Sequence, residues 1–224
     1  MNKYLVSSLI LLSLFVILSI QIRDNLDDKT IGNSNIINDL DAVTKHFPNV
    51  FASPMLNQIF AFLSEYGREY FWISILIIMF LFGRKDGKIV ALILLVSFTI
   101  IIPLNITIKD LVGRDRPLVH DEEYANNTLI PPPDKSYPSG HASLVSAGAV
   151  AVLLFFNCTR SQKLISLLLV VEAGMVCVSR LYLGVHYPSD VVAGILLGSG
   201  ISLLVASNHK MLEKLVNISI MHKQ

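Results

Sequence analysis

The 224-residue sequence has few charged side chains, two cysteines and almost no net charge. Only 16% of its residues are Asp, Glu, Lys or Arg, whereas about a quarter of a typical soluble domain is charged. Together with 53% hydrophobic residues, this composition is that of an integral membrane protein. The formal net charge of +1 at pH 7 provides no basic surface for nucleic acid, so we expect no nucleic-acid partner.

The two cysteines favour neither a disulfide nor a zinc site. Cys158 falls at the end of one predicted helix and Cys177 inside the next, and neither position suits an extracellular disulfide. Two cysteines without a histidine cluster do not make a zinc site. The chain also has no carboxylate cluster of the kind that magnesium prefers. We therefore expect neither a metal nor another cofactor.

Six apolar segments are each close to the roughly 17–25 residues that cross a bilayer as a helix. They are continuously apolar and lack the alternation of a membrane β-barrel. We predict an all-α fold, a six-transmembrane-helix bundle that forms a single domain over residues 1–224. The predicted spans are Tyr4–Ile20, Phe71–Phe82 (extended toward Tyr66), Ile89–Ile108, Ala142–Phe156, Leu164–Val178 and Val191–Ala206.

An amphipathic segment precedes the second span. Apolar residues recur at steps of three and four over residues 51–63, which predicts a short extramembrane helix on the membrane surface or packed on the bundle. Pro54 suits the first turn of this helix, with Ser53 as its N-cap. Arg68 and Glu69 follow, and we expect them at the membrane interface.

The basic residues outside the motifs described below indicate the orientation of the chain in the membrane. With the N-terminus inside, they fall on the cytoplasmic side, and an acidic loop within residues 21–69 falls on the opposite side. We expect a multi-pass protein of the cell membrane with both termini cytoplasmic. No Ala-x-Ala-like site follows Ile20, which favours an uncleaved first helix over a signal peptide. The cytoplasmic basic residues are Lys3, Arg84, Lys85, Lys88, Arg160, Lys163, Lys210, Lys214 and Lys223.

Three short clusters place ionisable side chains beside apolar segments, where a charge is costly unless it has a partner or a function. They are Lys109–Pro117 (KDLVGRDRP), Tyr137–His141 (YPSGH) and Ser179–Asp190 (SRLYLGVHYPSD). Their spacings are Lys-x6-Arg-Pro, Pro-Ser-Gly-His and Ser-Arg-x5-His-x3-Asp. Cations and imidazoles in one site suit a phosphoryl group, because cations neutralise its oxygens while one imidazole attacks and the other protonates the leaving oxygen.

The three clusters, in this order, resemble the three-part signature of the type 2 phosphatidic acid phosphatase superfamily. That group includes membrane lipid phosphatases, soluble bacterial acid phosphatases and vanadium haloperoxidases. The resemblance runs from about Lys109 to Asp190, within a motif-bearing core of about residues 89–206. It implies a membrane phosphatase that removes the terminal phosphate of a lipid phosphate or polyprenyl diphosphate through a phosphohistidine. All three clusters fall on the extracytoplasmic side of the predicted topology, so we expect the active site there.

His186 is the candidate nucleophile of this site. Asp190 lies four positions later, so a helical turn starting near Pro188 would bring its carboxylate to the imidazole and fix the tautomer. Taken alone, the pair could be a loop histidine beside a capping aspartate; the other two clusters favour catalysis. His141, at the start of an apolar helix, is the candidate general acid.

Five further residues are candidates for binding the substrate phosphate. Lys109, Arg116 and Arg180 supply positive charge that would also stabilise the transition state. Gly140 allows close backbone approach, and the Ser139 hydroxyl can donate a hydrogen bond. An ordinary helix start with Ser139 as N-cap is compatible with the same residues.

Three features outside these roles receive structural interpretations. Arg114 is expected to extend its side chain to the membrane interface. Glu172, an acid within the fifth span, is expected to be structural, with Asn105 as a candidate partner. The proline-containing stretch His120–Tyr137 is either a lid or substrate selector beside the site, or a spacer between helices.

Several alternatives stay open at this stage. A membrane lipid substrate is favoured because a soluble one needs no membrane at the site, but hydrolysis and phosphoryl transfer to another acceptor would use the same residues. A non-enzymatic transporter or scaffold is the alternative from another class. A transporter would usually show internal repeats or broken helices, and none is evident. Polyprenyl diphosphate, phosphatidylglycerophosphate, phosphatidate and phosphorylated glycolipid sugars are all candidate substrates.

Overall fold

A computed structural model describes residues 2–27, 36–42, 53–117 and 134–221 of the chain. Within these ranges every regular element is a helix, which confirms the predicted all-α fold class for this part of the molecule. The helices are α1 (Lys3–Asp27), α2 (Ile36–Ala42), α4 (Pro54–Tyr66), α5 (Glu69–Phe82), α6 (Lys85–Val112), α8 (Gly140–Phe155), α9 (Arg160–Tyr182), α10 (Pro188–Ala206) and α11 (His209–Met221).

The six predicted apolar segments correspond to α1, α5, α6, α8, α9 and α10. Four of these helices, namely α1, α6, α9 and α10, are long and apolar enough to cross a membrane. The other two, α5 and α8, are shorter apolar helices. The chain is thus a multi-pass membrane protein, whereas the number of six spans does not follow from helix length alone.

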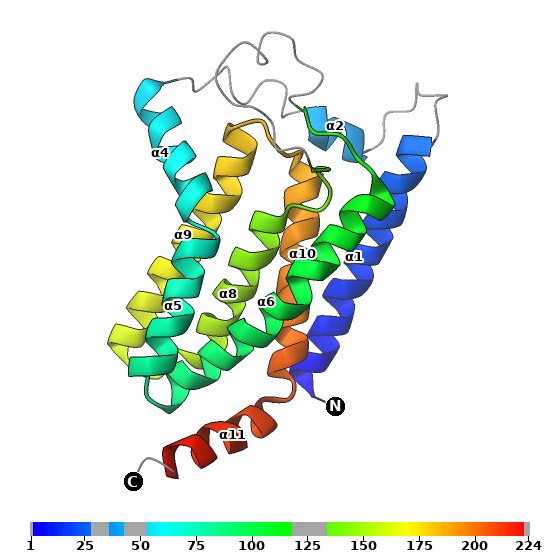
Figure 1. Cartoon of the computed structure of the whole chain (residues 1–224). Helices are drawn as coiled ribbons and strands as arrows, with labels where there is room; N and C mark the ends of the chain where they lie inside the picture. The colour runs from blue at the N-terminus through cyan, green and yellow to red at the C-terminus, as the bar shows by residue number, and fades with distance from the viewer. Residues whose placement is uncertain (1, 28–35, 43–52, 118–133, 222–224) are drawn as a thin grey trace.

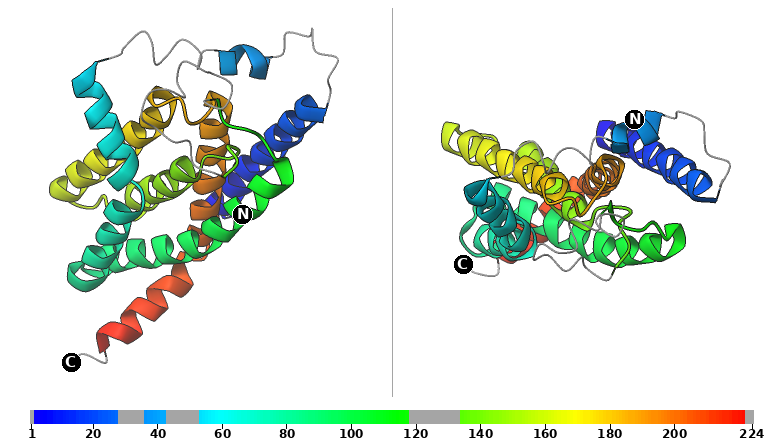
Figure 2. Two further views of the ribbon diagram at one scale, coloured as in Figure 1. Left: turned by 45° about the horizontal axis from the view of Figure 1, so that its top comes forward. Right: turned by 90° about the horizontal axis from the view of Figure 1, so that it is seen from above.

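Helix α8 lies in the interior of the bundle, where it packs against α6, α9 and α10 (Figure 1). Seen from above, α10 separates α8 from α1, while α4 and α5 cover α9 and α6 (Figure 2). The first and last turns of α8 therefore have neighbours on several sides. Residues at the start of α8 can be combined with residues from α6, α9 and α10.

Two glycines allow α10 to approach α8 closely. A Cβ atom at Gly194 would lie 2.5 Å from the carbonyl oxygen of Ser139, and one at Gly198 would lie 1.9 Å from that of Ser143. No side chain fits at these distances, and small residues at helix contacts are a common means of packing in membranes. This contact brings the N-terminal ends of α8 and α10 together.

The predicted amphipathic helix is α4, which begins with a proline in its first turn and has Ser53 at the N-cap position. The Ser53 side chain makes no capping hydrogen bond. The helix packs against α9, and Tyr182 Oη donates a hydrogen bond of 2.6 Å to Asn57 Oδ1. Of the two predicted placements, packing on the bundle is the one found.

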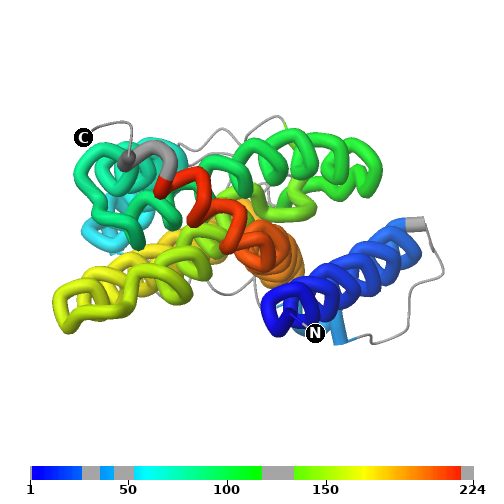
Figure 3. Tube along the Cα trace, turned by 90° about the horizontal axis from the view of Figure 1, so that it is seen from below, coloured from blue at the N-terminus to red at the C-terminus, as the bar shows by residue number. Residues whose placement is uncertain are grey.

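The two ends of the bundle differ in the way the topology prediction requires. The N-terminus, α11 and the α5–α6 and α8–α9 turns lie at the lower end in Figure 1, and Figure 3 shows α11 crossing that end. The described residues of the three motif clusters belong to the ends of α6 and α9, the starts of α8 and α10 and the adjoining segments, which lie at the upper end. Residues 28–35 and 43–52 of the acidic segment lie outside the described residues. Which end faces the cytoplasm stays a prediction.

Candidate active site

The three motif clusters meet around one cavity of about 320 Å³. The last turns of α6 and the segment after it form one side, the start of α8 forms another, and the end of α9 and the α9–α10 loop complete it. Six of the eight predicted site residues line the cavity, and Ser139 and Asp190 are buried beside it. The lining residues are Arg68, Glu69, Ile102, Asn105, Ile106, Lys109, Arg116, Asp134, Gly140, His141, Leu144, Arg180 and His186.

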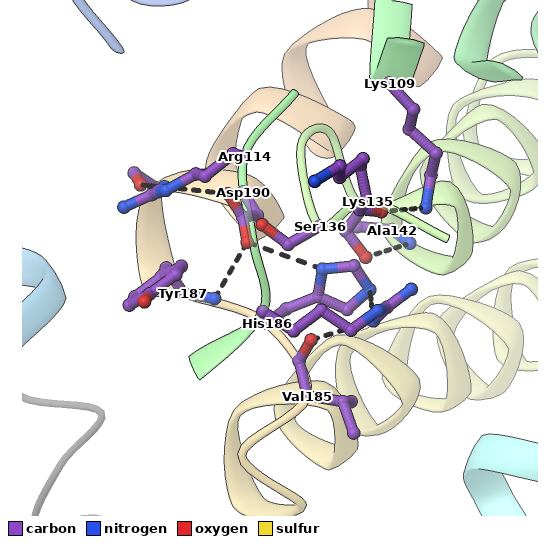
Figure 4. Close-up of polar contacts among 12 residues, drawn as sticks. Lys109, Arg114, Lys135, Ser136, Ala142, Val185, His186, Tyr187 and Asp190 are labelled. Atoms are coloured by element: carbon purple, nitrogen blue, oxygen red, sulfur yellow. Dashed lines mark hydrogen bonds and ion pairs between the residues drawn. The ribbon is translucent and has the colours of Figure 1, made fainter. Parts of the chain in front are cut away.

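His186 is buried in the short loop between α9 and α10, and both of its ring nitrogens face charged groups. Nδ1 lies 3.5 Å from Asp190 Oδ2, a contact drawn in Figure 4, and Nε2 lies 3.2 Å from Arg116 Nη1. Because a guanidinium only donates, Nε2 must accept, and the ring proton therefore resides on Nδ1 beside the carboxylate. The predicted pairing of His186 with Asp190 is found.

The imidazole of His186 is held in its neutral form. Burial lowers its pKa well below the usual range of histidine. The nearby cations Arg180, Arg116 and Lys109 lower this pKa further. The unprotonated Nε2 thus carries a lone pair beside a cluster of positive charges. This is the state in which an imidazole can act as a nucleophile.

Arg114 holds Asp190 from the side opposite His186 (Figure 4). Its Nη1 donates to Asp190 Oδ1 at 2.8 Å, its Nη2 donates to Asp41 Oδ2 at 2.5 Å, and its guanidinium lies 3.9 Å from the Tyr187 ring centroid. The prediction that Arg114 extends to the membrane interface is wrong. Two buried carboxylates neutralise its charge, so the side chain lies inside the protein with only 13% of it exposed.

Asp134 bridges two of the predicted phosphate-binding cations. Its carboxylate accepts a hydrogen bond of 2.7 Å from Arg116 Nη2 and another from Lys109 Nζ. Burial alone would raise the pKa of Asp134, but the bonds and charges of Lys109 and Arg116 outweigh it and lower this pKa to about 2. A carboxylate thus lies where phosphate oxygens were expected. Asp134 belongs to the stretch His120–Tyr137, of which residues 120–133 lie outside the described residues, as does any lid there.

His141 is the second residue of α8, and both of its ring nitrogens have partners. Nε2 lies 3.1 Å from the carbonyl oxygen of Ser64, and Nδ1 lies 3.2 Å from Arg68 Nη1. Since a carbonyl oxygen only accepts and a guanidinium only donates, the ring proton resides on Nε2. Arg68 lines the cavity, a role that was not predicted for it, and its expected position at the membrane interface stays a prediction.

Arg180 lies in the last turn of α9 with little exposure to solvent. Its Nη1 donates to Ser64 Oγ, but its Nε is buried and has no hydrogen-bond partner among the described residues. A buried donor in this condition is costly unless a ligand or water satisfies it. Beside a cavity lined by cations, an anionic oxygen is a suitable partner.

Ser139 and Gly140 were both predicted to bind the substrate phosphate, but they occupy different places in the structure. The Ser139 side chain is buried and lies at the N-cap of α8, where it accepts from Ala142 N at 3.5 Å. Gly140 lines the cavity, and a Cβ atom at this position would lie 3.7 Å from Arg68 Nη1. Ser139 therefore caps α8, and Gly140 is the residue of the pair that faces the cavity.

Glu172 has a different partner from the one predicted. Trp72 Nε1 of α5 donates a hydrogen bond of 2.9 Å to Glu172 Oε2 of α9. Asn105 instead donates to the carbonyl oxygen of Ile101 at 3.1 Å and lies 3.4 Å from Ser143 Oγ. Neither Glu172 nor Trp72 lines the cavity. A buried tryptophan that needs a partner for its N–H group is a sufficient structural reason for the acid.

A neutral buried imidazole with a carboxylate partner, a second imidazole and several cations around one cavity define a site suited to phosphoryl transfer. The model of the PAP2 superfamily matches residues 89–214, and the chain belongs to this family. It is therefore a membrane phosphatase, an enzyme that hydrolyses phosphate esters.

Relatives of known function are similar over most of the chain. The undecaprenyl-diphosphatase of Sulfolobus acidocaldarius is 41% identical over 198 residues, which cover 87% of each chain. Phosphatidylglycerophosphatase B of Bacillus subtilis is 28% identical over 188 residues, covering 77% of this chain and 85% of its own. A crystal structure of a transmembrane PAP2-type phosphatidylglycerolphosphate phosphatase from Bacillus subtilis has the same fold, with a TM-score of 0.70 at 24% identity over 92% of this chain and 96% of that one.

Proposed function

We propose that this protein removes the terminal phosphate of a membrane lipid, with a polyprenyl diphosphate as the favoured substrate and lipid monophosphates as the alternative. The observation that supports it most is the buried His186, neutral and unprotonated at Nε2, beside three cations that line the same cavity. The relative with 41% identity is an undecaprenyl-diphosphatase, which supports the diphosphate.

The first chemical step is attack by His186 on the terminal phosphorus. Its Nε2 forms the new P–N bond while the bond from phosphorus to the leaving oxygen breaks. Asp190 stabilises the positive charge that develops on the ring, because its carboxylate faces the Nδ1 proton. Substrate must first displace the Asp134 carboxylate from Lys109 and Arg116.

The cations and the second histidine complete the cycle. Lys109, Arg116 and Arg180 neutralise the oxygens of the phosphoryl group in the transition state. His141 donates a proton to the leaving oxygen, and the same residue then accepts a proton from the water that hydrolyses the phosphohistidine. The products are the dephosphorylated or monophosphorylated lipid and inorganic phosphate. None of these steps requires a metal ion, because fixed cations already supply the positive charge.

The same proposal includes the arrangement in the membrane. We assign residues 1–224 to one integral membrane domain with six spans, cytoplasmic termini and an extracytoplasmic active site. The basic residues Lys85, Arg160 and Lys210 support this orientation, because they belong to the end of the bundle opposite the cavity. A lipid phosphate held at the interface would present its terminal group to that cavity.

Phosphate release by the purified protein from a panel of lipids, without and with excess EDTA, tests the proposal. The panel contains a polyprenyl diphosphate, phosphatidylglycerophosphate and phosphatidate, with the His186→Ala variant as the control for contaminating phosphatases. We expect release from the diphosphate that persists in EDTA and is absent in the variant. Release from none of these lipids, or complete loss in EDTA that magnesium restores, would overturn the proposal.

A further inference from the structure

A fourth cation lines the cavity and belongs to none of the three motif clusters. Arg68 lies between α4 and α5, and its Nη1 is 3.2 Å from Nδ1 of His141. The carboxylate of Glu69 lies 2.5 Å from Nη2 of Arg68. The Nε atom of Arg68 is buried and has no hydrogen-bond partner among the described residues. Hence a guanidinium with an unused donor faces the general acid rather than the nucleophile.

The order of groups across the cavity determines which part of a substrate can reach Arg68. In-line attack places the nucleophile and the leaving oxygen on opposite sides of the phosphorus. With His186 as the nucleophile, the leaving oxygen lies toward His141. The atom that follows this oxygen is carbon in a monophosphate ester, but it is a second, negatively charged phosphorus group in a diphosphate. Arg68 beside His141 is therefore positioned for that second group.

The hydrogen bond between Arg68 and His141 also favours a diphosphate substrate. Arg68 donates to Nδ1, the nitrogen that has no proton of its own, while Nε2 is engaged with Ser64. In this arrangement the single N–H group of His141 is bound to a backbone carbonyl, so this bond must break before His141 can protonate a leaving alkoxide. A leaving phosphate is far less basic than an alkoxide and needs proton donation less. It does need a cation, and Arg68 provides one.

We propose that Arg68 binds the second phosphate of a diphosphate substrate and thereby makes the enzyme favour lipid diphosphates over lipid monophosphates. This inference rests on the proposed function and names the substrate class within it. A guanidinium pairs with a phosphate through two parallel N–H donors, and such charge-assisted bonds are about twice as strong as neutral ones.

The test compares one prenyl diphosphate with the prenyl monophosphate of the same chain length. The variants are Arg68→Gln, Arg68→Lys and, as a matched control, Arg84→Gln. The control removes an exposed arginine from the turn between α5 and α6, at the opposite end of the bundle. We expect Arg68→Gln to lower kcat/KM for the diphosphate by about 10- to 100-fold, the effect of one lost charge-assisted hydrogen bond. The monophosphate should lose less than about threefold, Arg68→Lys should recover part of the loss, and Arg84→Gln should equal the wild type.

Equal proportional losses on the two substrates in Arg68→Gln would overturn the inference, since Arg68 would then act on a group common to both or on the fold. If the Arg68→Gln variant is too unstable to measure, a second experiment tests the role of Arg68. It compares the inhibition of the wild-type enzyme by inorganic pyrophosphate with its inhibition by phosphate. Pyrophosphate should inhibit at least about tenfold more strongly, and equal inhibition would refute the role of Arg68. A wild-type enzyme that hydrolyses the monophosphate but not the diphosphate would also refute the inference, whereas one that hydrolyses neither would contradict the proposed function itself.

Discussion

Replacement of Arg114 by methionine tests how the site is held together, because this side chain compensates two buried carboxylates at once. The side chain of Asp190 has no exposed surface and that of Asp41 is 7% exposed. Arg114 contacts the first at 2.8 Å and the second at 2.5 Å. Methionine fills a similar volume but leaves both carboxylates without this cation.

The burial of an ion pair determines how much stability is lost when one partner is removed. Removal of one partner from a buried ion pair costs about 3–5 kcal/mol, since the remaining charge stays buried without compensation. The pair of Lys135 with Asp115 provides a matched control: its atoms are 2.6 Å apart, but the two side chains are 45% and 55% exposed. Exposed pairs of this kind contribute about 0–1 kcal/mol. Lys135→Met removes the same formal charge and should be nearly neutral.

Thermal unfolding of both variants in one detergent, together with kcat/KM, measures the difference. Arg114→Met should unfold at a clearly lower temperature than Lys135→Met. It should also lose about 10- to 100-fold in kcat/KM, because Asp190 loses a charge-assisted hydrogen bond that fixes it beside His186. If the two variants matched each other in stability and activity, the assignment of Arg114 as the support of Asp190 would be refuted.

Three other consequences of the structure can be measured independently. Gly198→Ala should lower stability by about 1–3 kcal/mol in thermal unfolding, because its Cβ would meet a backbone oxygen at 1.9 Å. Gly174→Ala is the control: its Cβ would have nothing within 4 Å, so this change should be neutral or stabilising by up to about 1 kcal/mol. Equal losses of stability in the two variants would contradict the close contact between α8 and α10. The lowered pKa of His186 keeps the nucleophile neutral, so the acid limb of kcat/KM, corrected for substrate ionisation, should lie below about pH 6.5, and a limb near pH 7 or above would argue against this nucleophile. In a variant without native cysteines, Lys135→Cys should react with an impermeant thiol reagent on intact cells and Lys85→Cys should not; the reverse would invert the topology.

The sequence was sufficient for features that depend on local patterns. Continuous apolar runs predicted the six main helices, and the amphipathic period with its proline predicted α4. That the three clusters meet followed from their resemblance to a family signature and not from a local pattern, because they lie on different helices and loops. The pairing of His186 with Asp190 does follow from a local spacing, since four positions across a helix start bring the two side chains together.

Features that depend on contacts between distant segments were missed. Arg114 and Arg116 are two positions apart, and only the packing of α2 against α10 determines that the first binds Asp41 and Asp190. Arg68 reaches the cavity because the turn between α4 and α5 lies beside the start of α8. No periodicity in the sequence encodes either approach.

Helices α2 and α11 were missed for a related reason. Helix α2 has seven residues, too few for a periodic signal, and its Asp41 is held by Arg114 and by the backbone N–H of Ser189. Helix α11 buries Leu212 and Val216 and contacts α6, so its apolar face is explained only once that neighbour is known. Both helices are stabilised by tertiary contacts more than by their own sequence.

The central claim is that His186 attacks phosphorus while His141 serves the leaving group, and a leaving-group series on two variants tests it most directly. The measurement is kcat/KM of His186→Ala and His141→Ala on a prenyl diphosphate, a nitrophenyl phosphate and an alkyl monophosphate, relative to the wild type. His186→Ala should be inactive on all three, because no phosphohistidine can form. His141→Ala should retain most activity on the diphosphate and the nitrophenyl ester and least on the alkyl ester, whose leaving alkoxide needs a proton. Equal losses for the two variants across the series would contradict the assignment of the nucleophile and the acid.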